Sequence, residues 1–236
     1  MRFKKIIRLF KNGNVCVCGL RGKGKDLLIG NVIARRKQPY VSNLNYGYEY
    51  IPLRLCDLDI KNKYTNFINN DVNKYDYPYP LKADIYVSDC GVYLPSQYCN
   101  QLNRDFEGLI SFQALSRHIA RCNIHFNAQN LNRVWDKVRE QSDIYIRCVK
   151  CIYLFGLVIQ KIVIYDKYES CLNRINPCKI KKPMFASKKV KQDVDLYLDN
   201  FYNIHGTVKS HWLIYVNKSK HDSYAFGKIL NKEIID

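Results

Sequence analysis

The stretch NVCVCGLRGKGKDLL carries residue types at a spacing that suits the binding of a phosphate chain. Gly19, Gly24 and Lys25 fit the pattern G-x-x-x-x-G-K-[ST], in which a glycine-rich loop directs backbone N–H groups at phosphates and a lysine adds positive charge. Asp26 stands where the pattern has a hydroxyl ligand for magnesium. A carboxylate can bind magnesium, but it also brings negative charge close to a triphosphate. The stretch is a working nucleotide site with an unusual metal ligand, a site that has lost its chemistry, or a chance match, and we favour the first.

The surroundings of the loop agree with phosphate binding. Cys18 ends a short β-prone run, and residues 24–38 carry apolar side chains at helical spacing until Pro39. A strand, a glycine-rich loop and a helix start in this order are what the binding mode requires. The residues expected to contact the nucleotide are Gly19, Leu20, Arg21, Gly22, Lys23, Gly24, Lys25, Asp26 and Leu27.

A second acidic residue follows a strand-like run further along the chain. The run ADIYVSDCG leads to Asp89, which we expect at the carboxyl end of a strand, where it would hold magnesium together with Asp26. Its ordinary alternative is an aspartate that terminates a strand. Cys90 stands where a hydrolytic site usually has a glutamate that activates water, and a neutral thiol is a poor general base.

The next strand-like run, NIHFNAQN, delivers Gln129. An amide at this place can orient water or sense the γ-phosphate, although a buried amide bonded to the backbone is an equally ordinary reading. Arg117 and His118 lie just upstream, where a solvated helix end is the plain alternative.

Composition limits the classes of partner. The formal net charge of +17 in 236 residues favours an acidic partner, with nucleic acid first and an anionic membrane surface second. The ten cysteines fall mostly in apolar runs, and the basic start lacks the apolar segment of a secretory signal, so we expect a reducing, intracellular compartment. Cys148, Cys151, Cys171 and Cys178 invite a zinc interpretation, which their spacing does not favour.

Strand-like and helix-like segments alternate, which predicts an α/β fold with a mainly parallel sheet flanked by helices. Expected strands are 14–18, 40–46, 48–55, 83–89, 123–130, 142–155 and 210–217, and expected helices are 24–38, 100–120 and 131–141. The apolar stretch 151–165 is too short for a membrane span and is read as two strands or one bent strand. The expected organisation is a P-loop ATPase core at 1–168 and a small basic C-terminal extension at 169–236, with one or two strands and an exposed basic segment at 170–192.

The order of these motifs resembles the zonular occludens toxin-like (Zot) P-loop ATPases of filamentous bacteriophages, which belong with the FtsK–HerA group of DNA-translocating ATPases. The resemblance spans residues 14–155. It is carried by GLRGKGKD, PYVSNLNY, IYVSDCGVYLPS, ALSRHIARCNIHFNAQN and RVWDKVREQSDIYIR. Its more specific parts are an Arg-His pair before a strand that ends in Gln, and a Ser-Asn pair after the first helix.

This resemblance implies roles for the residues. Lys25 and the neighbouring loop amides would hold the phosphates of ATP, Asp26 and Asp89 would hold Mg²⁺, and Gln129 would sense the γ-phosphate. An arginine of one subunit in an oligomeric ring would complete the site of the next subunit. The candidates for that arginine are Arg117, Arg133 and Arg139. Two features depart from the family: the transmembrane helix common in phage members is missing, and so is the glutamate at position 90.

The leading functional hypothesis is an ATP-driven motor that packages or exports viral DNA, with single-stranded DNA as the expected partner. A nucleotide-binding but non-hydrolysing DNA-binding or scaffold protein is the alternative, and a P-loop kinase is a third reading. A capsid or membrane-assembly component is a further candidate partner, and the expected location is the host cytoplasm or the face of a membrane. The lysines expected to contact DNA phosphates are Lys179, Lys181, Lys182, Lys188, Lys189 and Lys191.

Overall fold

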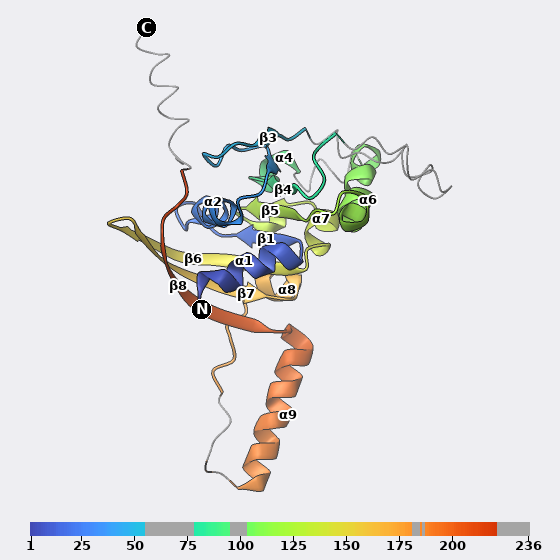
Figure 1. Ribbon diagram of the computed structural model, residues 1–236. Coiled ribbons are helices and arrows are strands. Elements are labelled where there is room, and N and C mark those ends of the chain that lie inside the picture. Colours follow the sequence, from blue (N-terminus) through green and yellow to red (C-terminus); the bar gives the residue numbers. More distant parts are fainter. Residues whose placement is uncertain (55–77, 95–102, 181–184, 186, 221–236) are drawn as a thin grey trace.

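The computed structural model describes residues 1–54, 78–94, 103–180, 185 and 187–220. One eight-stranded sheet forms its centre, with the strand order β3-β2-β4-β5-β1-β6-β7-β8 (Figure 1). The strands are β1 Val15–Cys18, β2 Tyr40–Ser42, β3 Ile51–Pro52, β4 Asp84–Val87, β5 Ile124–Ala128, β6 Ile144–Leu154, β7 Leu157–Tyr165 and β8 Val208–Val216. The strands from β3 to β6 in this order pair in parallel, whereas β7 and β8 are antiparallel additions at one side. The predicted α/β class with a mainly parallel sheet is confirmed.

Helices cover both faces of the sheet. They are α1 Phe3–Asn12, α2 Lys25–Arg36, α4 Cys90–Tyr93, α6 Asn103–Ile119, α7 Asp136–Glu140 and α8 Tyr168–Leu172. A further helix, α9 Lys188–His205, does not pack on the sheet. Alternation along β1 shows how the core divides: Val15 and Val17 pack in the cluster formed with α1 and α2, while Cys16 and Cys18 pack in the cluster formed with α6, α7 and α8. A strand buried on both faces therefore reads as a continuous apolar run.

The strand order decides which loops meet. β5 lies between β1 and β4, with Cys18 opposite Ala128 and Val87 opposite Phe126. All three strands run in the same direction, so the residues that follow their carboxyl ends gather at one edge of the sheet. The glycine-rich loop follows β1 at that edge, and Asp89 follows β4.

Several element boundaries differ from the prediction. The helix expected at 131–141 is divided into a 3₁₀ turn at Leu131–Arg133 and the short helix α7. Trp135 between them is extended and fully buried, and its N–H donates to the carbonyl oxygen of Leu94 at 3.0 Å. Anchoring this side chain and this N–H outside the helix interrupts the helical hydrogen bonds.

The strands expected at 40–46 and 48–55 are reduced to three and two residues, because the chain turns after Ser42. The helices α1 and α9 were not expected, and α9 begins inside the predicted irregular segment 170–192. Much of the polar stretch 62–82, the start of the helix predicted at 100–120, and Lys181 and Lys182 lie outside the described residues.

The C-terminal part contributes β8 to the sheet and the helix α9, which projects away from the sheet (orange in Figure 1). The described residues of this part contain one strand, in agreement with the prediction of one or two. The division at residue 168 remains a prediction. Among the described residues, no helix combines the length and the apolar character that crossing a bilayer requires.

Candidate nucleotide-binding site

The loop between β1 and α2 has the backbone of a phosphate-binding loop. Gly24 immediately precedes the helix with φ 78°, a left-handed conformation that favours glycine. A Cβ at Gly24 would lie only 2.8 Å from the Cys151 sulfur, and one at Gly19 would lie 2.6 Å from the carbonyl oxygen of Cys148. Both positions therefore need glycine for closeness to β6 as well as for conformation.

Lys25 opens helix α2, as the sequence predicted. Its side chain is only 5% exposed, yet it takes part in none of the ion pairs found among the described residues. The first N–H groups of a helix have no partner within the helix and carry partial positive charge. A buried ammonium beside such a helix start is an environment for an anion.

Asn127 on β5 joins the two predicted metal ligands. Its side-chain nitrogen Nδ2 donates to Oδ1 of Asp26 at 2.6 Å, and its oxygen Oδ1 accepts from the backbone N–H of Asp89 at 2.7 Å. One amide therefore fixes the Asp26 carboxylate and the position of the Asp89 backbone. The structure brings Lys25, Asp26 and Asp89 together, and it adds Asn127.

The charges at this edge are unbalanced. Loss of water contact raises the pKa of Asp89, the Asp26 carboxylate raises it further, and Lys25 opposes both effects without cancelling them. Two carboxylates that repel each other are stabilised by a cation between them. A raised carboxylate pKa beside a second carboxylate is typical of a functional site, whereas a stabilising ion pair lowers the pKa of its carboxylate.

Magnesium fits this donor set. Its preferred ligands are oxygens in an octahedral arrangement, and at nucleotide sites it takes one or two carboxylates together with phosphate and water oxygens. Asp26 and Asp89 would supply the carboxylates. In the described ranges no group of three or more His, Cys, Asp or Glu side chains could hold a metal by itself, so the remaining ligands would come from phosphate and water.

A second amide and a buried tyrosine hold the turn before Asp89. Asn43 pairs with both backbone groups of Ser88: its Nδ2 donates to the Ser88 carbonyl oxygen at 3.0 Å, and its Oδ1 accepts from the Ser88 N–H at 2.7 Å. The hydroxyl groups of Tyr46 and Ser88 are hydrogen-bonded, and Asn127 Nδ2 lies 3.3 Å from the Ser88 hydroxyl. This is the structural role of Asn43 in the Ser-Asn pair, which follows α2.

Gln160, in the antiparallel strand β7, supports the glycine-rich loop from the side. Its Nε2 donates to the carbonyl oxygens of Lys23 at 3.1 Å and of Gly24 at 2.9 Å. Its Oε1 accepts from the Tyr215 hydroxyl at 2.8 Å, and the side chain is fully buried. Sequence reasoning missed Gln160, although a polar residue inside the apolar run LVIQKIVIY was a signal.

Cys90 does not face the site. Its side chain is fully buried in the core, its Sγ lies 3.4 Å from the Val87 carbonyl oxygen, and burial raises its pKa. The thiol therefore remains protonated and cannot accept a proton from water. A glutamate in its place would enter the core instead of reaching a phosphate.

Gln129 follows β5 directly, as predicted, and its side chain is exposed. It lines a cleft of about 280 Å³ beside the loop, together with Lys23 from the loop, Arg147 from β6 and Arg174 after α8. The cleft is bordered by the glycine-rich loop, by the turn that follows β5, and by β6 and α8.

Arg117 lies at the opposite edge of the sheet. Its Nη2 donates to the carbonyl oxygen of Asn12 at 2.8 Å and contacts Oδ2 of Asp143 at 3.1 Å. Asn12 and Asp143 precede β1 and β6, so Arg117 lies beside the amino ends of the strands, with the length of the sheet between it and Lys25. Arg117 therefore does not complete the site of its own chain.

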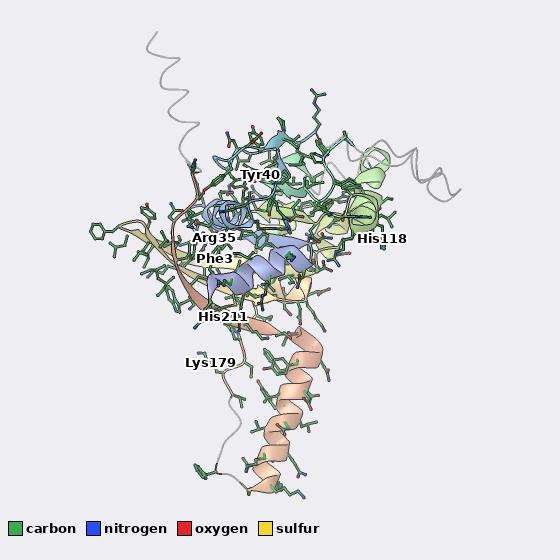
Figure 2. The ribbon with its side chains drawn as sticks, viewed as in Figure 1. Phe3, Arg35, Tyr40, His118, Lys179 and His211 are labelled. Atoms are coloured by element: carbon green, nitrogen blue, oxygen red, sulfur yellow. The ribbon has the colours of Figure 1, made fainter. Side chains whose placement is uncertain are left out.

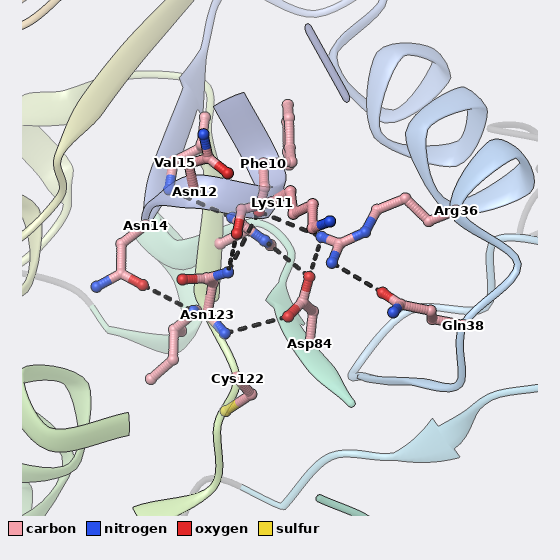
Figure 3. Close-up of polar contacts among 12 residues, drawn as sticks. Phe10, Lys11, Asn12, Asn14, Val15, Arg36, Gln38, Asp84, Cys122 and Asn123 are labelled. Carbon is pink, nitrogen blue, oxygen red and sulfur yellow. Dashed lines mark hydrogen bonds and ion pairs between the residues drawn. The ribbon is translucent and has the colours of Figure 1, made fainter. Parts of the chain in front are cut away.

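The same amino edge carries a buried polar network (Figure 3). Arg36 forms an ion pair with Oδ2 of Asp84, and the backbone N–H of Asn123 donates to Asp84 Oδ1 at 3.1 Å. The Nε2 of His125 lies 3.5 Å from Asp84 Oδ2, while its Nδ1 accepts from the N–H of Val15. Burial tends to raise the pKa of Asp84, but His125, Arg36 and the Asn123 N–H outweigh it and hold the pKa low.

The other two arginine candidates differ. Arg139 is used internally, because its Nη1 donates to the carbonyl oxygens of Leu131 and Val134 and its guanidinium lies 4.9 Å from the Tyr168 ring centre. Arg133 is exposed at the carboxyl edge, and a Cβ at Gly91 would lie 3.2 Å from its Cβ. Of the candidates, Arg133 is the one whose guanidinium has no hydrogen bond or ion pair among the described residues.

A parallel sheet, a glycine-rich loop leading to a buried lysine at the start of a helix, and an aspartate after the strand next but one define a P-loop nucleotide-binding fold. Comparison with family models and with curated proteins finds no match.

Solved structures show distant similarity. The N-terminal domain of zonular occludens toxin from Neisseria meningitidis superposes with a TM-score of 0.44 and 12% identity, over 91% of this chain and 97% of that one. The genome packaging NTPase B204 from Sulfolobus turreted icosahedral virus 2, in complex with AMPPCP, superposes with a TM-score of 0.41 and 12% identity, over 70% of this chain and 95% of that one. EssC (ATPases 2 and 3) from Geobacillus thermodenitrificans superposes with a TM-score of 0.38 and 10% identity, over 84% of this chain and 46% of that one. At these TM-scores and identities the likeness does not assign a function to this chain.

Proposed function

We propose that the chain binds ATP with Mg²⁺ at the carboxyl edge of its sheet and uses the bound nucleotide to drive the movement of DNA. The observation that carries the nucleotide site is the arrangement around Asn127. This amide ties Asp26 to Asp89 beside the buried Lys25, which has no ion-pair partner among the described residues. The movement of DNA rests on the motif order that resembles Zot-like ATPases and on the net charge of +17.

The residues would divide the work as follows. Lys25 and the first amides of α2 bind the phosphates, and the Lys25 charge offsets the negative charge of Asp26. Asp26 and Asp89 hold magnesium, which neutralises charge on the β- and γ-phosphates. Asn127 positions both acids, and Gln160 keeps the loop carbonyls turned away from the phosphates.

The test of the nucleotide site is Lys25→Ala. The affinity for ATP should fall by about 100-fold or more, equal to roughly 2.7 kcal/mol, because no other ammonium takes the place of Lys25. Equilibrium binding of a fluorescent ATP analogue would measure this. Lys23→Ala in the same loop is the matched control and should have a much smaller effect, because the contact of Lys23 with Gln160 uses its backbone carbonyl. Unchanged binding by a folded Lys25→Ala protein would reject the site.

A non-hydrolysing nucleotide-binding protein is the second candidate, and Cys90 specifically favours it. Position 90, where a hydrolytic site usually has a glutamate, faces the core and holds a thiol, so it supplies no general base to the site. ATP turnover measured with and without single-stranded DNA separates the two candidates. The motor requires turnover that DNA stimulates, whereas the alternative predicts tight binding without turnover.

We place the DNA contact of this proposal on helix α1. The exposed side of α1 carries cations and no acidic residue, while Ile6 and Phe10 on its other side are fully buried against the sheet. Because the apolar side is occupied, the cations are left to contact phosphates. We call these residues the α1 basic surface: Arg2, Lys4, Lys5, Arg8 and Lys11.

Neighbouring strand β8 extends the α1 basic surface. Burial lowers the pKa of His211, and the positive charges of the N-terminal amino group, Lys209 and Lys5 lower it further. These three cations therefore lie close to His211. Figure 2 shows His211 beside α1 and Lys179 on the segment that leads toward α9.

Two triple variants would decide which cations bind DNA. The first, Lys4→Gln/Arg8→Gln/Lys11→Gln, neutralises cations of the α1 basic surface. The second, Lys188→Gln/Lys189→Gln/Lys191→Gln, neutralises the tail cluster, by which we mean the C-terminal lysines that the sequence predicts to contact DNA and that lie at the start of α9. Each phosphate contact to a single strand contributes about 0.7 to the slope of log affinity against log salt, so three lost contacts should lower the slope by about 2. We expect this change for the α1 variant. The tail cluster stays a candidate, but α9 also carries Asp193, Asp195 and Asp199, which oppose phosphate binding.

A further inference from the structure

The turn between β6 and β7 carries an exposed apolar tip. Figure 1 shows this hairpin extending from the side of the sheet beyond the helices that cover it. Phe155 in the turn is 95% exposed, Tyr153 60% and Leu154 49%. No described helix covers these side chains, and a Cβ at Gly156 would meet nothing within 4 Å. An apolar group this exposed marks an interaction surface.

Strand register shows that the tip continues into an ordered face of the sheet. Paired residues on adjacent antiparallel strands point to the same side, so the register defines rows across β6, β7 and β8. The row nearest the tip is Leu154, Leu157 and Val216, and the second row is Ile152, Ile159 and Ile214. Five of these six side chains are between 40% and 67% exposed.

The third row changes character. It contains Lys150, Lys161 and Trp212, and the Lys161 ammonium lies 5.9 Å from the centre of the Trp212 ring. The opposite side of these strands is covered, since Gln160, Leu213 and Tyr215 are buried there. Moving away from the tip, the open face is therefore first aromatic and aliphatic, then aliphatic, and then cationic with one tryptophan.

From this ordering we infer that the β6–β7 hairpin inserts its tip into an anionic lipid surface. Apolar residues at the leading end, followed by tryptophan and lysine, match the succession from acyl chains to headgroups. Two residues of an antiparallel strand advance about 6.8 Å, so the Lys150–Lys161 row lies about 14 Å behind the Leu154–Leu157 row. Insertion by about 10 Å brings that lysine row to the headgroup layer.

A protein partner fits the observations less well. Binding of a second copy of the chain would need a complementary surface for each row. It would not explain why the rows change from apolar to cationic along the strands. The charge of +17 favours anionic lipid over neutral lipid. This inference does not rest on nucleotide binding, and either can fail without the other.

Vesicle flotation of the full chain tests the insertion. Wild type should float with vesicles of phosphatidylcholine and phosphatidylglycerol, and more weakly with phosphatidylcholine alone. The tip variant Leu154→Ser/Phe155→Ser should lose about tenfold or more in affinity, because each large apolar side chain contributes at least that factor when it leaves water. Lys150→Gln/Lys161→Gln should reduce the preference for the anionic vesicles.

Phe185→Ser is the matched control, because Phe185 is 96% exposed and lies in a different part of the chain. It should float as wild type does. The inference is overturned if wild type does not float, if the tip variant floats equally well, or if Phe185→Ser loses as much. It is also overturned if lipid-free wild type self-associates through the tip, which size measurements on the tip variant would reveal.

Tryptophan fluorescence provides a test that does not depend on changing the tip. The chain has two tryptophans: Trp135 is fully buried, and Trp212 is 48% exposed in the third row. Brominated anionic lipid should quench part of the emission, and Trp212→Phe should remove the quenched part. Absence of quenching, or quenching that persists in Trp212→Phe, would contradict insertion by this face.

Discussion

The two edges of the parallel sheet both carry carboxylates, but in opposite electrostatic states: Asp84 at the amino edge is buried, whereas Asp26 at the carboxyl edge is half-buried and Asp89 is exposed. At the amino edge, Asp84 has an ion pair with Arg36, a contact with His125 and a bond from the Asn123 N–H, and its pKa is lowered. At the carboxyl edge, the pKa of Asp89 is raised by partial loss of contact with water and by the nearby Asp26 carboxylate.

This difference separates a structural network from a binding site. The amino edge satisfies its charges within the chain, so its residues stabilise the fold. The carboxyl edge holds two acids beside each other, and a lysine that forms no ion pair among the residues that the structure describes. A divalent cation and a polyanion together would supply what that edge lacks, which is why we place the nucleotide there.

The largest effect should come from breaking the satisfied edge. Asp84→Ala leaves the Arg36 guanidinium without its carboxylate, and loss of one partner of a buried pair costs about 3–5 kcal/mol of unfolding free energy. Asp89→Ala at the other edge relieves repulsion and should leave the stability of the nucleotide-free protein nearly unchanged. Urea denaturation measures both. Equal losses would show that the two edges do not differ in the way described.

A smaller effect is expected from the support of the loop. Gln160→Leu removes the donor to the Lys23 and Gly24 carbonyl oxygens and the acceptor of the Tyr215 hydroxyl. Buried polar groups left unpaired cost about 1–3 kcal/mol, so ATP affinity should fall by about tenfold as the loop shifts. Tyr215→Phe keeps both bonds to the loop and should weaken binding less. Unchanged ATP affinity in Gln160→Leu would mean that the loop holds its conformation alone.

The smallest effect is a dependence of stability on pH at the amino edge. Burial lowers the pKa of His125, and Asp84 opposes this only in part, so the folded state keeps the ring neutral. The unfolded ring takes up a proton near its ordinary pKa of about 6.5. Unfolded chains therefore bind more protons, and stability is lost as the pH falls below about 6.5, by up to roughly 1.4 kcal/mol per pH unit.

His125→Gln should flatten this pH dependence, and thermal unfolding between neutral and mildly acidic pH would show it. His118→Gln is the control, because His118 lies exposed at the end of α6 and should leave the slope unchanged (Figure 2). A slope that persists in His125→Gln would assign the proton uptake to another group, such as His211, whose pKa is also lowered.

Local signals predicted the parts of the site that lie close together in sequence. The glycines of the loop, Lys25 at the start of the helix and Asp89 after its strand were all placed correctly, because each depends on a few neighbouring residues. The α/β class followed from the alternation of apolar periodicities. The helix α1 was missed because its basic residues were considered only as a failed secretory signal.

The supporting residues could not be predicted because they depend on strand order. Asn127 reaches both Asp26 and Asp89 only because β5 lies between β1 and β4. Gln160 reaches the loop only because β7 folds back beside β6. The polar residues at alternate positions in NIHFNAQN were a weak signal for the role of Asn127. Arg117 lies near the start of β5, as expected, and its role toward a neighbouring subunit stays a prediction.

The most direct test of the site compares ATP binding with magnesium and with a chelator, in wild type and in Asp26→Ala. If Asp26 is a metal ligand, wild type binds Mg-ATP more tightly than metal-free ATP. In Asp26→Ala the ratio of these two affinities should be smaller by a factor of about ten or more. Metal-free binding by the variant should be unchanged or tighter, because one negative charge near the triphosphate is gone. Equal loss of both forms of ATP in Asp26→Ala would contradict the metal site and leave Asp26 as the partner of Asn127 alone.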